Sequence, residues 1–331
     1  MKKNVEDMSY TKWWEPIEFA LSGIDLEGLK TICPLCKEIG FVVSRWIKGP
    51  TLKPIYILHL EEGEKGRICE INNKQSKNIR SKVSILEDDI KRLLDSRKSY
   101  VLFSGGKDSL ATLYYLKEIA KASNANLTAI YVDTTAGLPE NTNYVKKVCD
   151  YLEVTLEIVR PKIDYFTLAK EWGIPSFKYR WCCRELKIKP IAEFLSGIKG
   201  QKVIFDGIRA VESNIRKQYI PIWFHPGFKC LSVSPIFHWS NQEVVSFINS
   251  NGIPKTILHS MGTSTECWCG AYKTEKDFVK LYELNKDMFY KLVEIEEGNK
   301  SGYTFLYKDG QKKPLRNLEK QILEKKEYTR D

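Results

Sequence analysis

A pair of glycines between a strand-like run and a helix-like run is the feature that most constrains this chain. Residues 100–103 are apolar, Gly105 and Gly106 follow, and residues 109–122 carry apolar side chains at helical spacing. Adjacent glycines let the backbone turn sharply and approach a bound group closely, because no Cβ intervenes. The sequence therefore predicts a strand, a tight glycine turn and a helix in direct succession.

Further strand-like and helix-like runs alternate along the chain. They lie at residues 127–133, 141–152, 155–159, 165–172, 202–208 and 242–249. Such alternation favours a parallel sheet with helices on both faces. We therefore expect an α/β fold built on a doubly wound parallel sheet, and we find no internal repeat.

The composition is that of a folded protein without a membrane span. Hydrophobic residues make up 43% of the 331 residues and charged residues 28%, and no run approaches the roughly 18 apolar residues that cross a bilayer. The N-terminus is polar, so we expect a cytoplasmic protein that does not bind membranes. In that compartment its nine cysteines are better explained as metal ligands or catalytic thiols than as disulfides.

The net charge of +10 favours an anionic partner such as a nucleotide or a nucleic acid. Solvated lysine-rich helix faces explain the same charge without any partner.

The glycine turn is suited to binding a phosphate group. The following helix offers free N–H groups and the positive end of its dipole, and Lys107 adds a full charge. Ser104 and Ser109 add hydroxyl groups. The alternative is an ordinary glycine-rich turn between a strand and a helix.

The string Ser104-Gly105-Gly106-Lys107-Asp108-Ser109 resembles the pyrophosphate-binding loop of the ATP-pyrophosphatase and phosphoadenosine phosphosulfate (PAPS) reductase superfamily. It is not a Walker A loop. Asp133-Thr134-Thr135, followed by Leu138-Pro139-Glu140-Asn141-Thr142, is similar to a second element of that family. Here Thr135 stands where the family has a glycine.

Two later segments extend the resemblance. Trp181-Cys182-Cys183-Arg184-Glu185-Leu186-Lys187 is similar to the double-cysteine element of adenylyl-sulfate reductases, and residues 207–216 resemble the Gly-Ile-Arg segment. Ser234-Pro235-Ile236 and Ile253-Pro254 continue the match. Because the motifs follow in order over residues 98–272, the chain is identified as a member of the PAPS and adenylyl-sulfate reductase family, with an adenine nucleotide alpha hydrolase-like fold.

The resemblance implies a site for ATP or for adenylyl sulfate or PAPS. The nucleotide-binding residues carried over are Ser104, Gly105, Gly106, Lys107, Asp108, Ser109, Asp133, Thr142, Arg184, Lys187, Gly207, Arg209 and Glu212. Those expected to act in catalysis are Lys107, Asp108, Arg209 and Arg216.

Several of these residues have an alternative role. Arg209 and Arg216 lie seven residues apart and could face one anion from a helical turn, or they could pair with carboxylates such as Glu212. Asp108 and Asp133 could position magnesium, although an N-cap role for Asp108 is equally plausible.

Four cysteines in two later segments suit an iron–sulfur cluster. Soft thiolates from Cys182, Cys183, Cys267 and Cys269 fit [4Fe-4S] ligation, and the resemblance implies the same cluster. The second pair is one residue closer than the family's Cys-x-x-Cys, which leaves Cys230 as a substitute fourth ligand. Zinc or uncoordinated thiols are the alternatives.

A second cysteine pair lies near the N-terminus. Cys33 and Cys36 have the spacing of a zinc knuckle, and His59 and Cys69 could complete a tetrahedral zinc site. Free cysteines are the alternative. The site would staple a small β-rich unit that resembles a zinc ribbon, and such ribbons bind nucleic acid or protein or are purely structural.

These features divide the chain into five segments. They are an N-terminal segment at 1–30, the zinc-ribbon-like unit at 31–71, a linker and helix at 72–97, the PAPS-reductase-like domain at 98–272, and a helical C-terminal extension at 273–331.

Residues 270–331 contain no cysteine, whereas thiol-dependent reductases of the family carry a catalytic cysteine in the C-terminal tail. A reductase mechanism here would need Cys230 or Cys149. We therefore favour ATP-dependent, pyrophosphate-releasing activation for sulfur transfer, with nucleic acid as a candidate acceptor and a sulfur- or electron-donor protein as a candidate partner. The alternatives are a reductase that produces sulfite and a non-catalytic nucleotide- or DNA-binding adaptor.

Overall fold

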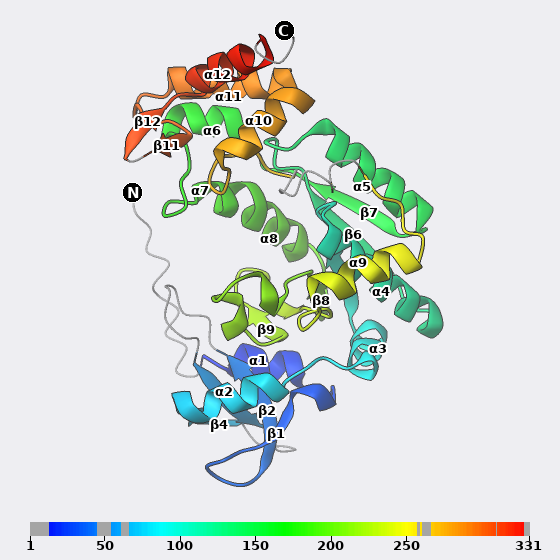
Figure 1. Cartoon of the computed structure of the whole chain (residues 1–331). Coiled ribbons are helices and arrows are strands. Elements are labelled where there is room, and N and C mark those ends of the chain that lie inside the picture. The colour runs from blue at the N-terminus through cyan, green and yellow to red at the C-terminus, as the bar shows by residue number, and fades with distance from the viewer. Residues whose placement is uncertain are drawn as a thin grey trace. The chain divides into compact units, whose positions relative to one another are not determined.

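The structure is a computed structural model that describes residues 13–44, 54–60, 66–256, 259, 266–308 and 310–327 (Figure 1). The chain forms two compact units. The first unit comprises Met1–Leu102, Asp108–Thr128 and Lys199–Asn251, and the second comprises Phe103–Lys107, Ala129–Ile198 and Gly252–Asp331.

The central sheet has six strands in the order β7-β6-β5-β8-β10-β9. Their bounds are β5 Lys98–Leu102, β6 Leu127–Val132, β7 Thr155–Val159, β8 Lys202–Phe205, β9 Ile222–His225 and β10 Cys230–Val233. β8 pairs in parallel with β5 and β10, whereas β9 is antiparallel to β10. The expected α/β fold is confirmed, and its sheet is mixed because a short hairpin joins β9 to β10.

The helices expected from the alternation are present. They are α4 Lys107–Ser123, α5 Pro139–Tyr151, α6 Tyr165–Trp172 and α9 Asn241–Ser250, and the structure adds α7 Trp181–Cys183 and α8 Lys189–Ser196. β8 ends at Phe205, three residues before the expected end. The reason is a side-chain turn, in which Asp206 Oδ1 accepts a hydrogen bond from the Ile208 N–H at 3.1 Å and replaces the strand ladder.

A small antiparallel sheet belongs to the first unit. Its strands, in order, are β1 Lys30–Ile32, β2 Ile39–Ser44, β3 Ile55–His59 and β4 Arg67–Ile71. Every residue of β3 is buried, because β3 is an inner strand of this sheet. Before the sheet lie α1 Glu15–Leu21 and η1 Glu27–Leu29, and after it lie α2 Asn73–Lys82 and α3 Glu87–Ser96.

Helix α2 occupies residues that the sequence analysis assigns to a linker. The Asn72 side chain caps it by accepting from the Gln75 N–H at 3.0 Å, and Ile79 and Arg80 are buried. The Arg80 guanidinium donates to the Gln218 carbonyl. Tertiary contacts therefore stabilise a helix whose polar composition alone does not predict one.

The C-terminal helices of the second unit share a core with the cysteine-bearing segments. These elements are α10 Glu275–Leu284, α11 Lys286–Gly298, α12 Leu315–Glu327 and the hairpin of β11 Leu306–Lys308 with β12 Gln311–Lys313 (Figure 1). Phe278 and Phe289 belong to the same buried cluster as Trp181, Cys182 and Trp268. Residues 273–327 therefore help to enclose two of the cysteines. Across the described residues, no helix is long and apolar enough to span a bilayer.

The first testable prediction concerns His225 at the end of β9. Its ring stacks on Phe228 at 3.6 Å, and its Nδ1 accepts from the Phe228 N–H at 3.1 Å. Burial lowers the pKa of His225 from 6.5 to about 4, so the folded state holds the neutral ring. The resulting stability is present above pH 6.5 and is lost as the pH falls towards 4, by about 3 kcal/mol.

Urea unfolding of the wild type and of His225→Asn across this pH range tests the assignment. The variant keeps a neutral acceptor, so the difference in unfolding free energy between the two proteins should change with pH. A constant difference would show that His225 is not the titrating group.

Candidate functional site

A buried asparagine of the second unit, Asn141, contacts the glycine turn and stabilises it. Gly105 has φ of +85°, and a Cβ there would lie 2.7 Å from Asn141 Oδ1. The Asn141 side-chain amide donates to the Ser104 carbonyl at 2.9 Å, and His259 Nε2 lies 2.8 Å from the Gly105 carbonyl oxygen. Glycine is therefore required at this position by both backbone conformation and space.

Neither Asn141 nor His259 is among the predicted site residues. Asn141 lies inside the Leu138–Thr142 motif quoted above, so that motif carried the signal that could have found it. His259 has no motif around it, and only the folded chain brings it to the glycine turn.

In the first unit, β8 delivers a glycine to the start of α4. A Cβ on Gly207 would lie 2.9 Å from the Asp108 carbonyl carbon and from the Ser109 nitrogen. These are backbone atoms at the N-terminus of the helix that follows parallel strand β5. Glycine at 207 therefore allows two backbone segments to meet at the carboxyl ends of neighbouring strands, where open α/β sheets bind ligands.

Arg209 contacts Asp108 at this point and orients its carboxylate. Its Nε is 2.9 Å from Asp108 Oδ1, and its other nitrogens donate to the Trp239 carbonyl at 3.1 Å and to Asn241 Oδ1 at 2.7 Å. Only 1% of Arg209 is exposed. The guanidinium thus holds the carboxylate of Asp108 in one orientation.

Arg216 differs from Arg209 in environment. It is partly exposed and forms an ion pair with Glu212, whose carboxylate also accepts from the Arg209 N–H at 2.9 Å. Arg209 is the N-cap of η3 Ala210–Glu212, and Arg216 is the first residue of η4 Arg216–Gln218. Residues 213–215 separate these two turns, so the two arginines do not lie on one continuous helix.

The segment after β6 adds polar groups within the second unit. Asp133 pairs with Arg160 at 2.9 Å and accepts from the Thr135 N–H at 3.0 Å. Thr135 adopts φ of +60°, a conformation that favours glycine and agrees with the family's glycine at this position. Thr142 Oγ1 lies 3.1 Å from the Tyr131 hydroxyl.

Four thiols of the second unit gather into one group, which we call the thiol cluster: Cys182, Cys183, Cys267 and Cys269. Cys182 Sγ and Cys269 Sγ lie 3.4 Å apart, and hydrogen bonds to other members shift the pKa of each thiol. The first pair lies on α7, which continues into π-helix η2 Arg184–Ile188. π-Helical turns of this kind frequently occur at functional sites.

Cys230 is the substitute fourth ligand named in the sequence analysis. It lies in β10 of the first unit, and its pKa is raised to about 12 by burial, with Lys202 opposing the shift.

Cationic side chains adjoin the thiol cluster. Lys187 pairs with Glu266. The hydrogen bond with Cys182 lowers the pKa of Cys183, burial opposes this shift, and the charge of Lys187 lowers the pKa further. The Lys273 ammonium lies 4.2 Å from the centre of the Trp268 ring. Arg184 pairs with Glu185 at 2.8 Å. Arg184 and Lys187 therefore both have carboxylate partners in this structure.

The thiol cluster has the chemistry of an iron–sulfur ligand set. Four thiols converge, and the indole Nε1 of Trp268, between Cys267 and Cys269, is buried with no acceptor among the described residues. Bound inorganic sulfide accepts N–H hydrogen bonds, which tune such clusters. The residues present fit a [4Fe-4S] group.

A second donor set lies in the small sheet of the first unit. Donor atoms of Cys33, Cys36, His59 and Cys69 all lie within 4.8 Å of one another. Lys37, directly after Cys36, adopts φ of +69° and closes the knuckle by donating its N–H to the Cys33 carbonyl at 2.9 Å. His59 Nδ1 lies 3.1 Å from the Ile39 carbonyl, which directs Nε2 towards Cys36 Sγ at 3.4 Å. Two thiols on a knuckle, one further thiol and an oriented imidazole fit tetrahedral zinc.

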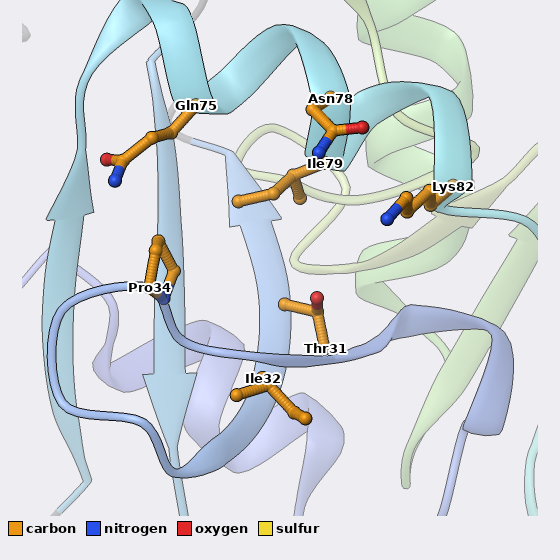
Figure 2. Close-up of a pocket in the computed structure, with 7 residues that line it drawn as sticks. All are labelled: Thr31, Ile32, Pro34, Gln75, Asn78, Ile79 and Lys82. Atoms are coloured by element: carbon orange, nitrogen blue, oxygen red, sulfur yellow. The ribbon is translucent and has the colours of Figure 1, made fainter.

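A hollow of about 330 Å³ lies beside this donor set. Figure 2 shows residues of α2 facing the β1 segment across it, and its lining is Thr31, Ile32, Pro34, Gln75, Asn78, Ile79 and Lys82. Lys82 is the one charged side chain of this lining. The hollow contains none of the predicted site residues.

Comparison with known proteins identifies one family. The family model described as "Phosphoadenosine phosphosulfate reductase domain" matches residues 98–293. An uncharacterized protein of Methanocaldococcus jannaschii is 28% identical over 60% of this chain and 48% of its own length. An adenosine 5'-phosphosulfate reductase of Lysinibacillus sphaericus is 27% identical over 41% of this chain and 59% of its own length. The chain thus spans about half the length of the curated relatives that it matches.

Two solved structures are distantly similar. Phosphoadenylyl-sulfate reductase from Candida auris aligns with a TM-score of 0.44 and 18% identity, over 60% of this chain and 97% of its own. The U34-tRNA thiolase NcsA from Methanococcus maripaludis, with its [4Fe-4S] cluster, aligns with a TM-score of 0.40 and 18% identity, over 76% and 78%.

The second prediction tests the close approach at Gly207. In Gly207→Ala the new methyl group must displace the backbone of Asp108 and Ser109, so calorimetry should show ATP bound at least about tenfold more weakly, or about 1.4 kcal/mol. Gly298→Ala is the matched control, because its Cβ would meet nothing within 4 Å. Equal ATP affinity in both variants, with unchanged circular dichroism, would contradict a role for this contact.

Proposed function

Because the chain belongs to the phosphoadenosine phosphosulfate reductase domain family, we propose that it binds ATP and activates an acceptor oxygen for replacement by sulfur. The glycine turn and the start of α4 would bind the phosphates, with Lys107 supplying charge and Ser104 and Ser109 supplying hydroxyl groups. Gly207 has no Cβ, so the backbone after β8 would come close to the bound phosphates. The close contact of Gly207 with the start of α4 supports this role. Thr142, Arg184 and Glu212 would complete the nucleotide site.

The charges around this site support a metal-assisted reaction. Arg209 is buried and holds the Asp108 carboxylate at 2.9 Å, so we assign Arg209 a positioning role. Asp108 and Asp133 would hold a magnesium ion, which prefers carboxylate oxygens and phosphates. Arg216, which is partly exposed beside Glu212, would meet the phosphate charge that develops in the reaction.

The observation that carries the choice of reaction is the placement of the thiols. Of the nine cysteines, three belong to the N-terminal donor set and four to the thiol cluster, which leaves Cys149 and Cys230. Burial raises the pKa of each of these two thiols to about 12. Neither is a thiolate at neutral pH, so neither suits nucleophilic attack on a sulfonucleotide.

Adenylation followed by sulfur transfer needs no such thiol. The acceptor oxygen attacks the α-phosphorus of ATP, a new O–P bond forms, and the bond to the β-phosphate breaks to release pyrophosphate. Hydrosulfide then attacks the activated carbon, the C–O bond breaks, AMP leaves and the sulfhydryl proton is lost to solvent. No electron is gained or lost in either step.

We propose a [4Fe-4S] group on the thiol cluster. When bound, it would supply an electrostatic field that helps to orient the incoming sulfur anion, because four thiolate ligands leave no iron free to hold sulfide. Cys182, Cys183, Cys267 and Cys269 would be its ligands, while Lys187 would offset the negative charge of the thiolates. Trp268 would donate its otherwise unpartnered indole N–H to a sulfide.

Reduction of adenylyl sulfate or PAPS to sulfite is the second candidate function. The observation that favours it is the similarity to proteins named adenosine 5'-phosphosulfate reductase. A third possibility is a nucleotide-binding adaptor without turnover.

The third prediction separates these functions. Anaerobic protein given ATP, magnesium, sulfide and an acceptor should release pyrophosphate, and Lys107→Ala should bind ATP about tenfold to a hundredfold more weakly. Lys121→Ala removes an exposed lysine near the end of the same helix and should change nothing. Sulfite from adenylyl sulfate or PAPS, without pyrophosphate from ATP, would instead support the reductase. Tight ATP binding with neither product would support the adaptor.

We also propose that Cys33, Cys36, His59 and Cys69 bind zinc and that this zinc stabilises the small sheet. His59 lies on β3 and Cys69 on β4, two strands that pair directly. A metal at this point would tie both strands to the knuckle and add to the stability of a small unit.

The fourth prediction is a crossed metal analysis of the two sites. Wild-type protein purified without oxygen should contain about one zinc and about four iron atoms per chain. Cys69→Ser should lose the zinc and keep the iron, whereas Cys183→Ser should lose the iron and keep the zinc. Cys149→Ala, which removes a thiol outside both sites, should keep both. If Cys69→Ser kept its zinc, Cys69 would not be a zinc ligand and the zinc site would lie elsewhere in the chain.

A further inference from the structure

The second unit carries an exposed group of aromatic and cationic side chains, which we call the aromatic platform: Phe177, Lys178, Tyr179, Arg180 and Tyr272. Phe177 is 64% exposed, Tyr179 62% and Tyr272 55%. Large apolar side chains gathered at a protein surface mark interaction sites more often than isolated ones do.

The platform has a defined geometry. The Phe177 and Tyr272 rings pack edge to face, with centroids 5.6 Å apart and planes at 90°. The Arg180 guanidinium carbon lies 5.8 Å from the first ring centre and 5.5 Å from the second, and this residue also donates to the Tyr272 hydroxyl. The rings are therefore held in place although they remain exposed.

A hydrogen-bonded turn presents the first three side chains. The Ser176 N–H donates to the Tyr179 carbonyl at 3.1 Å, and the Tyr179 N–H donates to Ser176 Oγ at 3.1 Å. This turn orders a segment in which residues 176–180 are all exposed. An ordered turn with two exposed aromatic residues is pre-organised for a ligand, because little side-chain entropy is lost on binding.

The charge of this segment is uniformly positive. Residues 172–183 contain Lys178 and Arg180 and no aspartate or glutamate, while the next cation, Arg184, pairs with Glu185. Aromatic rings interleaved with cations are the combination that binds single-stranded nucleic acid, because bases stack on rings and phosphates pair with cations. A protein partner would gain little from two like charges unless it were strongly acidic.

The platform adjoins the thiol cluster along both of its chain segments. Arg180 is separated from Cys182 only by Trp181, and Tyr272 follows Cys269 by three residues. A group bound on the platform is therefore delivered beside the thiols.

We propose that the aromatic platform binds an unpaired base of a single-stranded nucleic acid, which is the sulfur acceptor of the reaction proposed above. Phe177 and Tyr272 stack against bases, and Lys178 and Arg180 pair with the flanking phosphates. This inference rests on the proposed function for the role of acceptor, whereas the binding itself does not.

The test uses the full-length protein and a fluorescein-labelled 12-nucleotide single-stranded RNA of mixed sequence, followed by fluorescence anisotropy. Phe177→Ala combined with Tyr272→Ala should weaken binding at least about tenfold, since stacking contributes about 1–3 kcal/mol per base. Lys178→Ala should make the salt dependence shallower by about 0.7 in log–log slope. Tyr303→Ala is the matched control, because Tyr303 is a 59% exposed aromatic of the same unit, and it should leave binding unchanged.

Two further measurements keep the outcomes distinct. A duplex of the same length should bind more weakly than the single strand, because its bases are already stacked. ATP affinity and melting temperature should be equal in the platform variant and the wild type, which excludes misfolding and adenine stacking as causes. Equal RNA affinity in the platform variant and in Tyr303→Ala would overturn the proposal, as would duplex binding as tight as single-strand binding or an absence of RNA binding.

Pyrophosphate release is measured in the same samples. RNA binding that depends on the platform, without pyrophosphate from ATP, would support the platform and contradict the proposed reaction. Pyrophosphate release from ATP, together with RNA binding that does not depend on the platform, would support the proposed reaction and contradict the role of the platform.

Discussion

The close approach of Gly207 to the first turn of α4 is the constraint on which the first unit's part of the site depends. A Cβ at this point would lie 2.9 Å from backbone atoms of Asp108 and Ser109, so only glycine lets the end of β8 reach the helix N-terminus. Two features hold the approach in place. The Asp206 carboxylate accepts hydrogen bonds from the hydroxyl groups of Ser232 at 2.9 Å and Ser234 at 2.6 Å. The buried Arg209 guanidinium forms an ion pair with the Asp108 carboxylate. The N-terminus of α4 is thereby left with a fixed backbone and an oriented carboxylate, which suit the phosphate binding that we propose.

The distribution of thiols separates structural from chemical roles in this chain. Two groups of cysteines converge with other ligand-type side chains, whereas Cys149 and Cys230 are isolated in α5 and β10 and are shifted by burial towards the neutral thiol. Convergence of thiols is costly unless something binds them, because clustered thiolates repel and buried thiols lack strong partners. The orphaned indole N–H of Trp268 within the second group adds to that cost. Both groups therefore suggest metal-bound states, and the choice of sulfur transfer over reduction follows from the two thiols that remain.

Much of the fold could be predicted because its signals are local. Hydrophobic periodicity indicated β5, β6 and β7 and the helices between them, and the glycine pair indicated the turn before α4. Helix α2 was missed because its residues are polar and its stability comes from a cap by Asn72 and from tertiary contacts of Arg80. The end of β8 was misjudged because a buried carboxylate, Asp206, turns the chain, and burial is not visible in a sequence.

The residue types and their order could be recognised without a structure: the string at 104–109 for which we propose phosphate binding, the cysteine pairs and the motifs that identify the family. Those are local patterns whose chemistry follows from composition and spacing. Only the tertiary structure decided what each side chain does. It buried Arg209 against Asp108 while leaving Arg216 partly exposed beside Glu212. It also brought Asn141 and His259 to the glycine turn. The reason is physical: partner choice and burial arise from contacts between residues far apart in the chain, and these form only when the sheet and its helices pack.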